Sequence, residues 1–255
     1  MKFDCIIMNP PYDGSLHLKI LEHALKFKKD DGILVNLSPV SWLHSPKLYY
    51  TNDINKFSRI IKPLSKLEII EAKKATAFFN TAIGNDLGIY VYDNKTNLNI
   101  KCKQIILDIM HKVYNDKFVS LMDALKYDNK EYELVIPHIH GNIGNKDFYE
   151  VMPNRYEVAL KGSGWGEIKL SFNTEKERRN FYDSCFCNFY KNLMAFSKRT
   201  ISVPRSFLPY MNDYSKVWTD EDYCKYFNLT KEESEFMCRE VDDYRVKDFI
   251  EYEEI

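Results

Sequence analysis

The sequence predicts an α/β protein with two regions, a sheet-forming region over residues 1–100 and an α+β region over residues 101–255. Within the first hundred residues, short apolar runs alternate with segments of helical periodicity, which is typical of strand–helix–strand units in a parallel sheet. After residue 101 this alternation stops, and short strand-like segments are followed by helices with capping signals. A chain of 255 residues is also long enough to form two hydrophobic cores.

The first expected element is a strand over residues 3–8. Its apolar residues do not alternate with polar ones, which predicts a central strand that is covered on both faces. The strand ends at Asn9-Pro10-Pro11-Tyr12, where neither proline can donate a hydrogen bond to a neighbouring strand. Each proline also restricts the residue before it to extended geometry, so Asn9 is held in a narrow conformational range. Ligands of open α/β sheets bind at this carboxyl end of the strands.

The rest of the first region continues the alternation. Apolar residues recur at helical spacing from Leu16 to about Phe27, and the polar residues 28–32 are expected to close that helix. The further expected elements are a strand over 33–37, an irregular or weakly helical segment over 42–50, a segment with apolar residues on one face over 52–64, a strand over 67–70, a loop over 77–84 and a strand over 88–92. The first forty residues therefore form a strand–helix–strand unit with a parallel crossover.

The residues that end the first strand suit chemistry on an amino group. An amine conjugated to a ring, or an amide nitrogen, is a poor nucleophile because its lone pair is delocalised. The Asn9 side-chain oxygen and the Pro10 carbonyl could accept its two N–H bonds, which favours a pyramidal nitrogen with a free lone pair. Tyr12 offers a face on which a planar base could stack, worth roughly 1–3 kcal/mol per base. The alternative is an ordinary strand-to-turn junction.

Asn9-Pro10-Pro11-Tyr12 directly after a strand resembles the catalytic motif of S-adenosylmethionine-dependent amino-methyltransferases, chiefly the N6-adenine DNA methyltransferases of restriction-modification systems. The resemblance covers about the first hundred residues. It implies part of a Rossmann-like methyltransferase sheet, running from the catalytic strand to an antiparallel pair at the sheet edge. Phe79 or Phe78 would place a second ring against the flipped adenine, with core packing as the alternative. Related motifs occur in enzymes that methylate ribosomal RNA bases or a release-factor glutamine, so these substrates stay open.

The resemblance also implies a cofactor half, which in this class normally precedes the catalytic motif. Only eight residues precede Asn9 here. The glycines over 162–166 and 141–144 are not followed by a helix, and the first set is typical of a β-hairpin turn. We therefore expect the exposed flank of the first strand to be covered by the C-terminal region or, preferably, by a second polypeptide that carries the glycine-rich loop. The alternative is a DNA-binding or assembly subunit without catalysis.

The second region has the size of a target-recognition region. Strand-like segments are expected over 134–136, 148–152 and around 162–166, and Thr174 with Glu177 predicts a capping box that opens a helix. The densest basic stretch is either a solvated face or a phosphate contact, and comprises Arg178, Arg179, Lys191, Lys198, Arg199 and Arg205. Residues 208–233 resemble the C-terminal segment of adenine methyltransferases from bacterial and phage restriction-modification systems, with helices beginning after Thr219 and Thr230. A second region of this size favours DNA as the substrate, because the glutamine methyltransferases end near their catalytic fold.

Composition narrows the remaining possibilities. The 36 basic and 37 acidic residues nearly cancel, so the chain as a whole has no basic signature for nucleic acid. Its 6 cysteines lack the spacing of a zinc site and are expected to be free cytosolic thiols. His138 and His140 would share a strand face, but packing is preferred to metal binding because no third ligand is near in sequence. No leader or membrane span is recognised, and a cytoplasmic location is expected.

Overall fold

The computed structural model describes residues 1–81, 83, 86–124, 132–136, 168–197, 205–240 and 249–254. The chain divides into two compact units, each described by itself: the first comprises Met1–Lys103 with Val246–Ile255, and the second comprises Gln104–Arg245. Helices and strands occur in both, so the predicted mixed α/β class is confirmed. The glycine-rich segments 141–144 and 162–166, the strand over 148–152 and both histidines of 138–140 lie outside the described residues.

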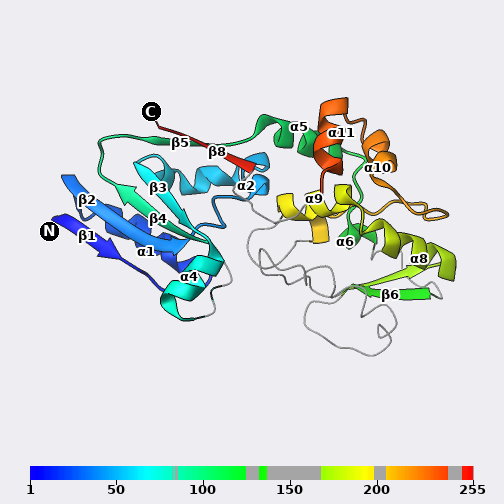
Figure 1. The fold of residues 1–255 in the computed structure, drawn as a ribbon, viewed down its shortest axis with the longest axis horizontal. Coiled ribbons are helices and arrows are strands. Elements are labelled where there is room, and N and C mark those ends of the chain that lie inside the picture. The colour runs from blue at the N-terminus through cyan, green and yellow to red at the C-terminus, as the bar shows by residue number, and fades with distance from the viewer. Residues whose placement is uncertain are drawn as a thin grey trace. The chain divides into compact units, whose positions relative to one another are not determined.

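The first unit contains one sheet of four strands and one of two. Its elements are β1 (Phe3–Met8), α1 (Leu16–Leu25), β2 (Lys28–Pro39), α2 (Pro46–Tyr50), the 3-10 helix Asp53–Phe57, α3 (Ser58–Ile61), β3 (Lys66–Ile70), α4 (Ala72–Phe79), β4 (Leu87–Tyr92), β5 (Leu98–Cys102) and β8 (Ile250–Glu254). Figure 1 shows α1 against the sheet and α4 at the end of β3.

The strands of the larger sheet lie in the order β1-β2-β4-β3. β1 pairs parallel with β2, whereas β4 is antiparallel to both β2 and β3. β3 therefore runs in the same direction as β1 and β2, and the carboxyl ends of these three strands lie at the same end of the sheet (Figure 1). Four of the strands expected from the sequence are thus present. Their arrangement brings the end of β1, the end of β2 and the start of α4 to the same end of the sheet, where β1, β2 and β3 have their carboxyl ends.

Two expected boundaries are wrong. Residues 28–32 do not close the first helix, because β2 already begins at Lys28. A side chain at Gly32 would place its Cβ 2.8 Å from the Asp4 carbonyl oxygen, so glycine permits this close approach of β1. The loop expected over 77–84 is also partly helical, since α4 extends to Phe79 and ends at Asn80 in the left-handed region with φ 50°.

One face of the sheet carries the core of the first unit. Buried Leu34, Tyr90 and Tyr92 pack there with Leu18 and Leu21 of α1. On β1, Ile6 and Met8 are partly buried against this cluster. Burial of these side chains removes apolar surface from water and stabilises the unit at about 25 cal/mol per Å².

The opposite face and the free edge are open, which overturns the expectation of a central, doubly covered first strand. β1 is the edge strand of the sheet, and among the described strands it pairs with β2 alone. Phe3, Ile7 and Ile33 are 46%, 79% and 37% exposed. The lack of polar alternation in residues 3–8 therefore does not arise from burial within the described chain.

The C-terminal strand belongs to the first unit. β8 pairs antiparallel with β5, with Cys102 opposite Ile250, and the Lys103 backbone N–H donates to the Phe249 carbonyl at 3.0 Å. Tyr252 of β8 also hydrogen-bonds the buried His44 side chain. The boundary predicted at residue 100 assigns this strand to the second region, whereas the compact units group it with the first.

The second unit combines a strand pair with helices. Its described elements are α5 (Gln104–Val113), α6 (Leu121–Ala124), β6 (Tyr132–Ile136), β7 (Ile168–Phe172), α8 (Glu175–Ser184), α9 (Asn188–Ser197), the 3-10 helix Arg205–Phe207, α10 (Asp220–Tyr226) and α11 (Lys231–Cys238). β6 and β7 pair antiparallel. Phe189 stacks on Tyr223 with ring centroids 5.0 Å apart and on Phe227 at 5.7 Å, which anchors α9 on α10.

Helix caps follow the sequence closely. Thr219 with Asp222, and Thr230 with Glu233, form complete capping boxes at α10 and α11. At α8 the Thr174 hydroxyl accepts from the Glu177 backbone N–H, as predicted. The Glu177 carboxylate, however, accepts from the Asn173 N–H at 2.9 Å, one residue before the expected donor. None of the described helices has the length and hydropathy needed to span a bilayer.

Candidate active site

The motif lies directly after the edge strand. Met8, the last residue of β1, pairs with Asn36 of β2, so Asn9 leaves the sheet beside the end of its neighbouring strand. Pro10 is buried, whereas Asn9, Pro11 and Tyr12 are exposed. The buried proline anchors the loop, and the polar and aromatic side chains on either side of it face solvent.

A hydrogen bond orders the motif. The Tyr12 hydroxyl donates to Asn9 Oδ1 at 2.6 Å and lies 3.5 Å from the Leu37 carbonyl oxygen. Partial burial raises the pKa of Tyr12, so the phenol keeps the proton that this bond requires. An amide oxygen has two lone pairs, so Asn9 Oδ1 can accept a second donor while Tyr12 holds it in place. The arrangement offers an oriented acceptor beside an aromatic ring that is 37% exposed.

A buried histidine lies behind this ring. His17, in the first turn of α1, meets Tyr12 edge-to-face with the ring centroids 6.2 Å apart. The side chain is buried, and neither ring nitrogen has a hydrogen-bond partner among the described residues. Burial lowers the pKa of His17, which favours the neutral imidazole. His17 therefore supports Tyr12 by packing and adds no positive charge to the site.

The end of β2 adds polar groups that the sequence reasoning missed. Asn36 is fully buried and donates from Nδ2 to the Ser38 hydroxyl at 2.8 Å. Its Oδ1 has no partner among the described residues, which is unusual for a buried amide. The signal available in the sequence was an asparagine inside the apolar run 33–37, a position where a buried strand seldom has one.

Phe78 and Phe79 lie at the end of α4, which starts at the edge where β1 and β2 also end (Figure 1). Their rings pack edge-to-face with centroids 5.0 Å apart. Phe78 is 82% exposed and Phe79 is 38% exposed, so core packing does not explain Phe78. Their contact with a substrate base stays a prediction.

The described residues do not fit S-adenosylmethionine. A cradle for this cofactor needs a glycine-rich turn between a strand and a helix. In the described segments the glycines are Gly14, Gly32 and Gly88. Gly32 and Gly88 lie within strands, and Gly14 is a single glycine in the turn before α1, with φ 53°. The motif therefore has an amino-group acceptor but no cofactor cradle in the part of the chain that the structure describes.

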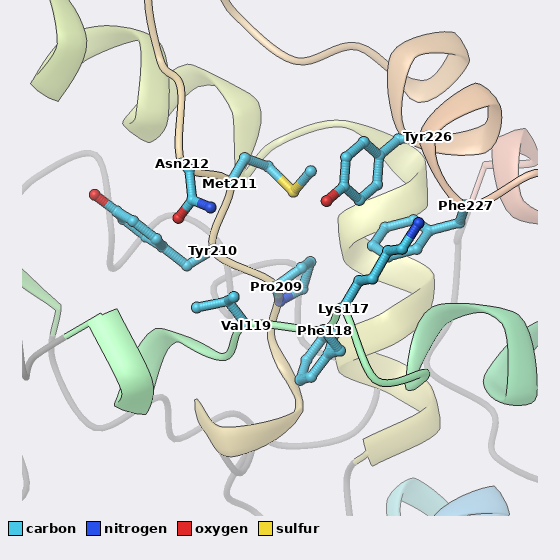
Figure 2. Close-up of a pocket in the computed structure, with 9 residues that line it drawn as sticks. All are labelled: Lys117, Phe118, Val119, Pro209, Tyr210, Met211, Asn212, Tyr226 and Phe227. Atoms are coloured by element: carbon cyan, nitrogen blue, oxygen red, sulfur yellow. The ribbon is translucent and has the colours of Figure 1, made fainter.

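Other candidate sites are separate from the motif. Among the residues described, no group of three or more histidine, cysteine or acidic side chains could hold a metal ion. The second unit has a small open pocket lined by residues 117–119, 209–212 and 226–227. Figure 2 shows the Met211 side chain pointing toward the Tyr226 ring. The basic side chains Lys198 and Arg199 lie outside the described residues, and Arg178 pairs with Glu175.

Models of known families, curated proteins and solved structures give no match to this chain. Its function is therefore inferred from the residues and geometry of the motif.

Proposed function

We propose that the chain takes part in methyl transfer from S-adenosylmethionine to the N6 amino group of adenine in DNA, as a component of a restriction-modification or phage system. The observation that carries this proposal is the exposed Asn9 amide oxygen, held by Tyr12 at 2.6 Å and followed by a buried proline. A plain strand-to-turn junction does not need an oriented, exposed acceptor.

In this proposal the motif holds and activates the amino group. Adenine N6 donates one hydrogen bond to Asn9 Oδ1, which already accepts from Tyr12, and one to the Pro10 carbonyl. Two acceptors favour a pyramidal nitrogen, whose lone pair is no longer delocalised into the ring. His17 packs against Tyr12 as the neutral imidazole, and no base is needed before the lone pair becomes available. S-adenosylmethionine, when bound, would supply the methyl group and leave as S-adenosylhomocysteine, and N6 would then lose one of its two protons to solvent.

The adenine has to leave the DNA stack to reach this edge of the sheet. Extrusion of a base costs a few kcal/mol, and stacking on an aromatic ring returns roughly 1–3 kcal/mol. Tyr12 would provide one face, and Phe79 or Phe78, the last residues of α4, would provide another. The exposure of Phe78, at 82%, supports a binding role for the end of α4.

The topology also supports the proposal. The resemblance implies a parallel pair that begins at the motif strand and an antiparallel pair at the far side of the sheet. β1 and β2 are the parallel pair, and β4 and β3 are the antiparallel one. The second unit, Gln104–Arg245, has the size of a target-recognition region, which favours DNA over a protein amide.

The test is made in the source cells, where every natural partner is present. The gene is deleted and replaced by a copy that encodes the wild-type chain, Asn9→Ala or Asn55→Ala. Asn55 is exposed in the 3-10 helix and serves as the matched control. N6-methyladenine is measured in digested genomic DNA by mass spectrometry. Compared with the wild-type copy, Asn9→Ala should lower the methylation rate by about 10²–10³-fold, as loss of a preorganised polar group does. The Asn55→Ala copy should methylate the DNA as the wild-type copy does.

The same strains separate the rival functions. The lack of a cofactor cradle among the described residues favours an assembly subunit without catalysis, which predicts that deletion removes the methyl mark while Asn9→Ala retains it. If the mark appears in ribosomal RNA or a protein amide, and never in DNA, the substrate assignment is wrong. If deletion changes none of these methyl groups, methyl transfer itself is refuted.

A further inference from the structure

Two uncovered apolar surfaces meet at β1. Its outer edge has no strand partner among the described residues, and a free edge presents a row of backbone donors and acceptors. On the sheet face opposite the core, Cys5 pairs in register with Ile33, and Ile7 pairs with Val35. Cys5, Ile7 and Ile33 are exposed. Edge and face together form one continuous surface, here called the β1 surface.

Charged side chains, which discourage pairing with another strand, occur only at the start of the β1 surface. Lys2 pairs with Asp30 at 3.3 Å, and Lys29 pairs with Asp4 at 2.8 Å. From Cys5 to Met8 the strand carries no charged side chain. Natural sheets normally place charges, prolines or bulges on an exposed edge to prevent pairing. The uncharged half that leads into Asn9 is therefore built to be paired, and an apolar protein strand suits it better than nucleic acid.

We propose that a second polypeptide occupies the β1 surface by adding a strand along the free edge and packing a helix on the apolar face. We further infer that this polypeptide carries the glycine-rich turn for S-adenosylmethionine, and this part rests on the proposed function. An added strand would run parallel to β1 as far as Asn9. Its carboxyl end, where cofactors bind in such sheets, would then lie next to the amino-group acceptor.

The geometry favours this occupant over a second copy of the chain. Two β1 strands paired edge to edge would leave the Ile7 face open on both copies. Two copies packed face to face would cover Ile7 and leave both edges unpaired. A strand followed by a helix covers both parts of the surface in one interface.

The occupant is identified by site-specific crosslinking in the source cells. Ile7 is replaced by the photoreactive p-benzoylphenylalanine, and Met122, 40% exposed in the second unit, receives the same replacement as a control. The proposal predicts a crosslink at Ile7, absent at Met122, to one polypeptide whose sequence contains a glycine-rich turn between a strand and a helix. A crosslink to another copy of the chain, to residues 104–245 of the same chain, or no crosslink above the control would overturn it.

The identified polypeptide is then purified and mixed with the full chain. A complex with one copy of each should form, measured by light scattering, and should slow alkylation of the exposed Cys5 thiol at least tenfold. Ile7→Lys should prevent both effects without changing the thermal stability of the free chain, because Ile7 is 79% exposed. An unchanged Cys5 alkylation rate in the complex would show that the interface lies elsewhere and refute the proposal.

These measurements separate the interface from the chemistry. A complex that protects Cys5 but binds no S-adenosylmethionine upholds the docking surface and refutes the cofactor-bearing partner. A complex that binds the cofactor but methylates no adenine leaves the interface standing and contradicts the proposed function. Robust adenine methylation by the purified chain alone, with Cys5 fully reactive, would refute the inference and support the function.

Discussion

The two units distribute their apolar side chains differently. In the second unit, exposed large apolar side chains such as Met122, Val217 and Tyr226 are scattered over different elements. In the first unit, Phe3, Ile7 and Ile33 gather on adjoining strands at one edge. Scattered exposed apolar residues are normal for soluble proteins, whereas a contiguous set marks an interaction surface. The first unit therefore has a sheet whose core face is covered within the unit and whose other face is exposed at Phe3, Ile7 and Ile33.

The largest expected effect tests the second unit. Phe189 is fully buried between Tyr223 and Phe227, so Phe189→Ala should destabilise this unit by about 3–5 kcal/mol. Hydrogen exchange by mass spectrometry resolves the two units separately. Faster exchange is expected in α9 and α10, with β1 and β2 unchanged. Equal acceleration in both units would mean that they unfold together.

The next effect compares the two faces of the first sheet. Leu34 is fully buried on the core face, and Leu34→Ala should lower the free energy of unfolding by about 2–5 kcal/mol. Ile7→Ala, on the open face, should change it by less than about 0.5 kcal/mol. Both values come from urea unfolding of the isolated chain. A cost above about 1 kcal/mol for Ile7→Ala would show that the chain itself covers this face.

A pH titration tests the ion pair between Lys112 of α5 and Glu233 of α11 in the second unit. Glu233 is 8% exposed and accepts from the Lys112 ammonium at 2.6 Å. Burial alone would raise the pKa of Glu233. The hydrogen bonds from Lys112 and from the Thr230 backbone N–H outweigh it and lower this pKa below its ordinary value of 4.5. Because the folded pKa is depressed, the stabilisation is present above about pH 4.5 and is lost as pH falls further. Glu233→Gln should weaken this pH dependence in α5 and α11, measured by hydrogen exchange, and an unchanged dependence would contradict the assignment.

The smallest effect concerns a helix cap. Thr219 accepts from the Asp222 backbone N–H, and its own N–H donates to the Asp222 carboxylate at 3.1 Å. Thr219→Ala should cost about 1 kcal/mol, while Thr219→Ser retains the acceptor and most of the stability. Thermal unfolding distinguishes the two variants. Equal melting temperatures for both would indicate that the cap does not stabilise α10.

Local sequence patterns predicted where strands and helix caps form better than they predicted which face of a strand is buried. Residues 33–37, 67–70 and 88–92 all lie in strands, because short apolar runs between polar breaks report strand formation directly. The helical end of α4 was missed since Asn80 ends it in the left-handed region without the usual glycine. The exposure of β1 could not be deduced from its composition, because an apolar strand has the same sequence whether its cover belongs to this chain or another.

The site was predicted only in part, for a similar reason. Asn9, Pro10, Pro11 and Tyr12 are adjacent in sequence, so the pattern itself brings them together. The bond from Tyr12 to Asn9 and the placement of His17 behind the ring depend on how the loop meets α1. Asn36 reaches the motif's neighbourhood only through the register of β1 with β2, which sequence periodicity does not give.

The pairing of β5 with β8 makes the second unit an insertion. Before the second unit β5 ends at Cys102, after it β8 begins at Ile250, and these two residues are paired opposite each other. An inserted module whose entry and exit strands are hydrogen-bonded neighbours can be exchanged for another with little disturbance of its host, provided the replacement has closely spaced ends. Such an exchange would leave the Asn9 loop and the sheet that carries it as they are.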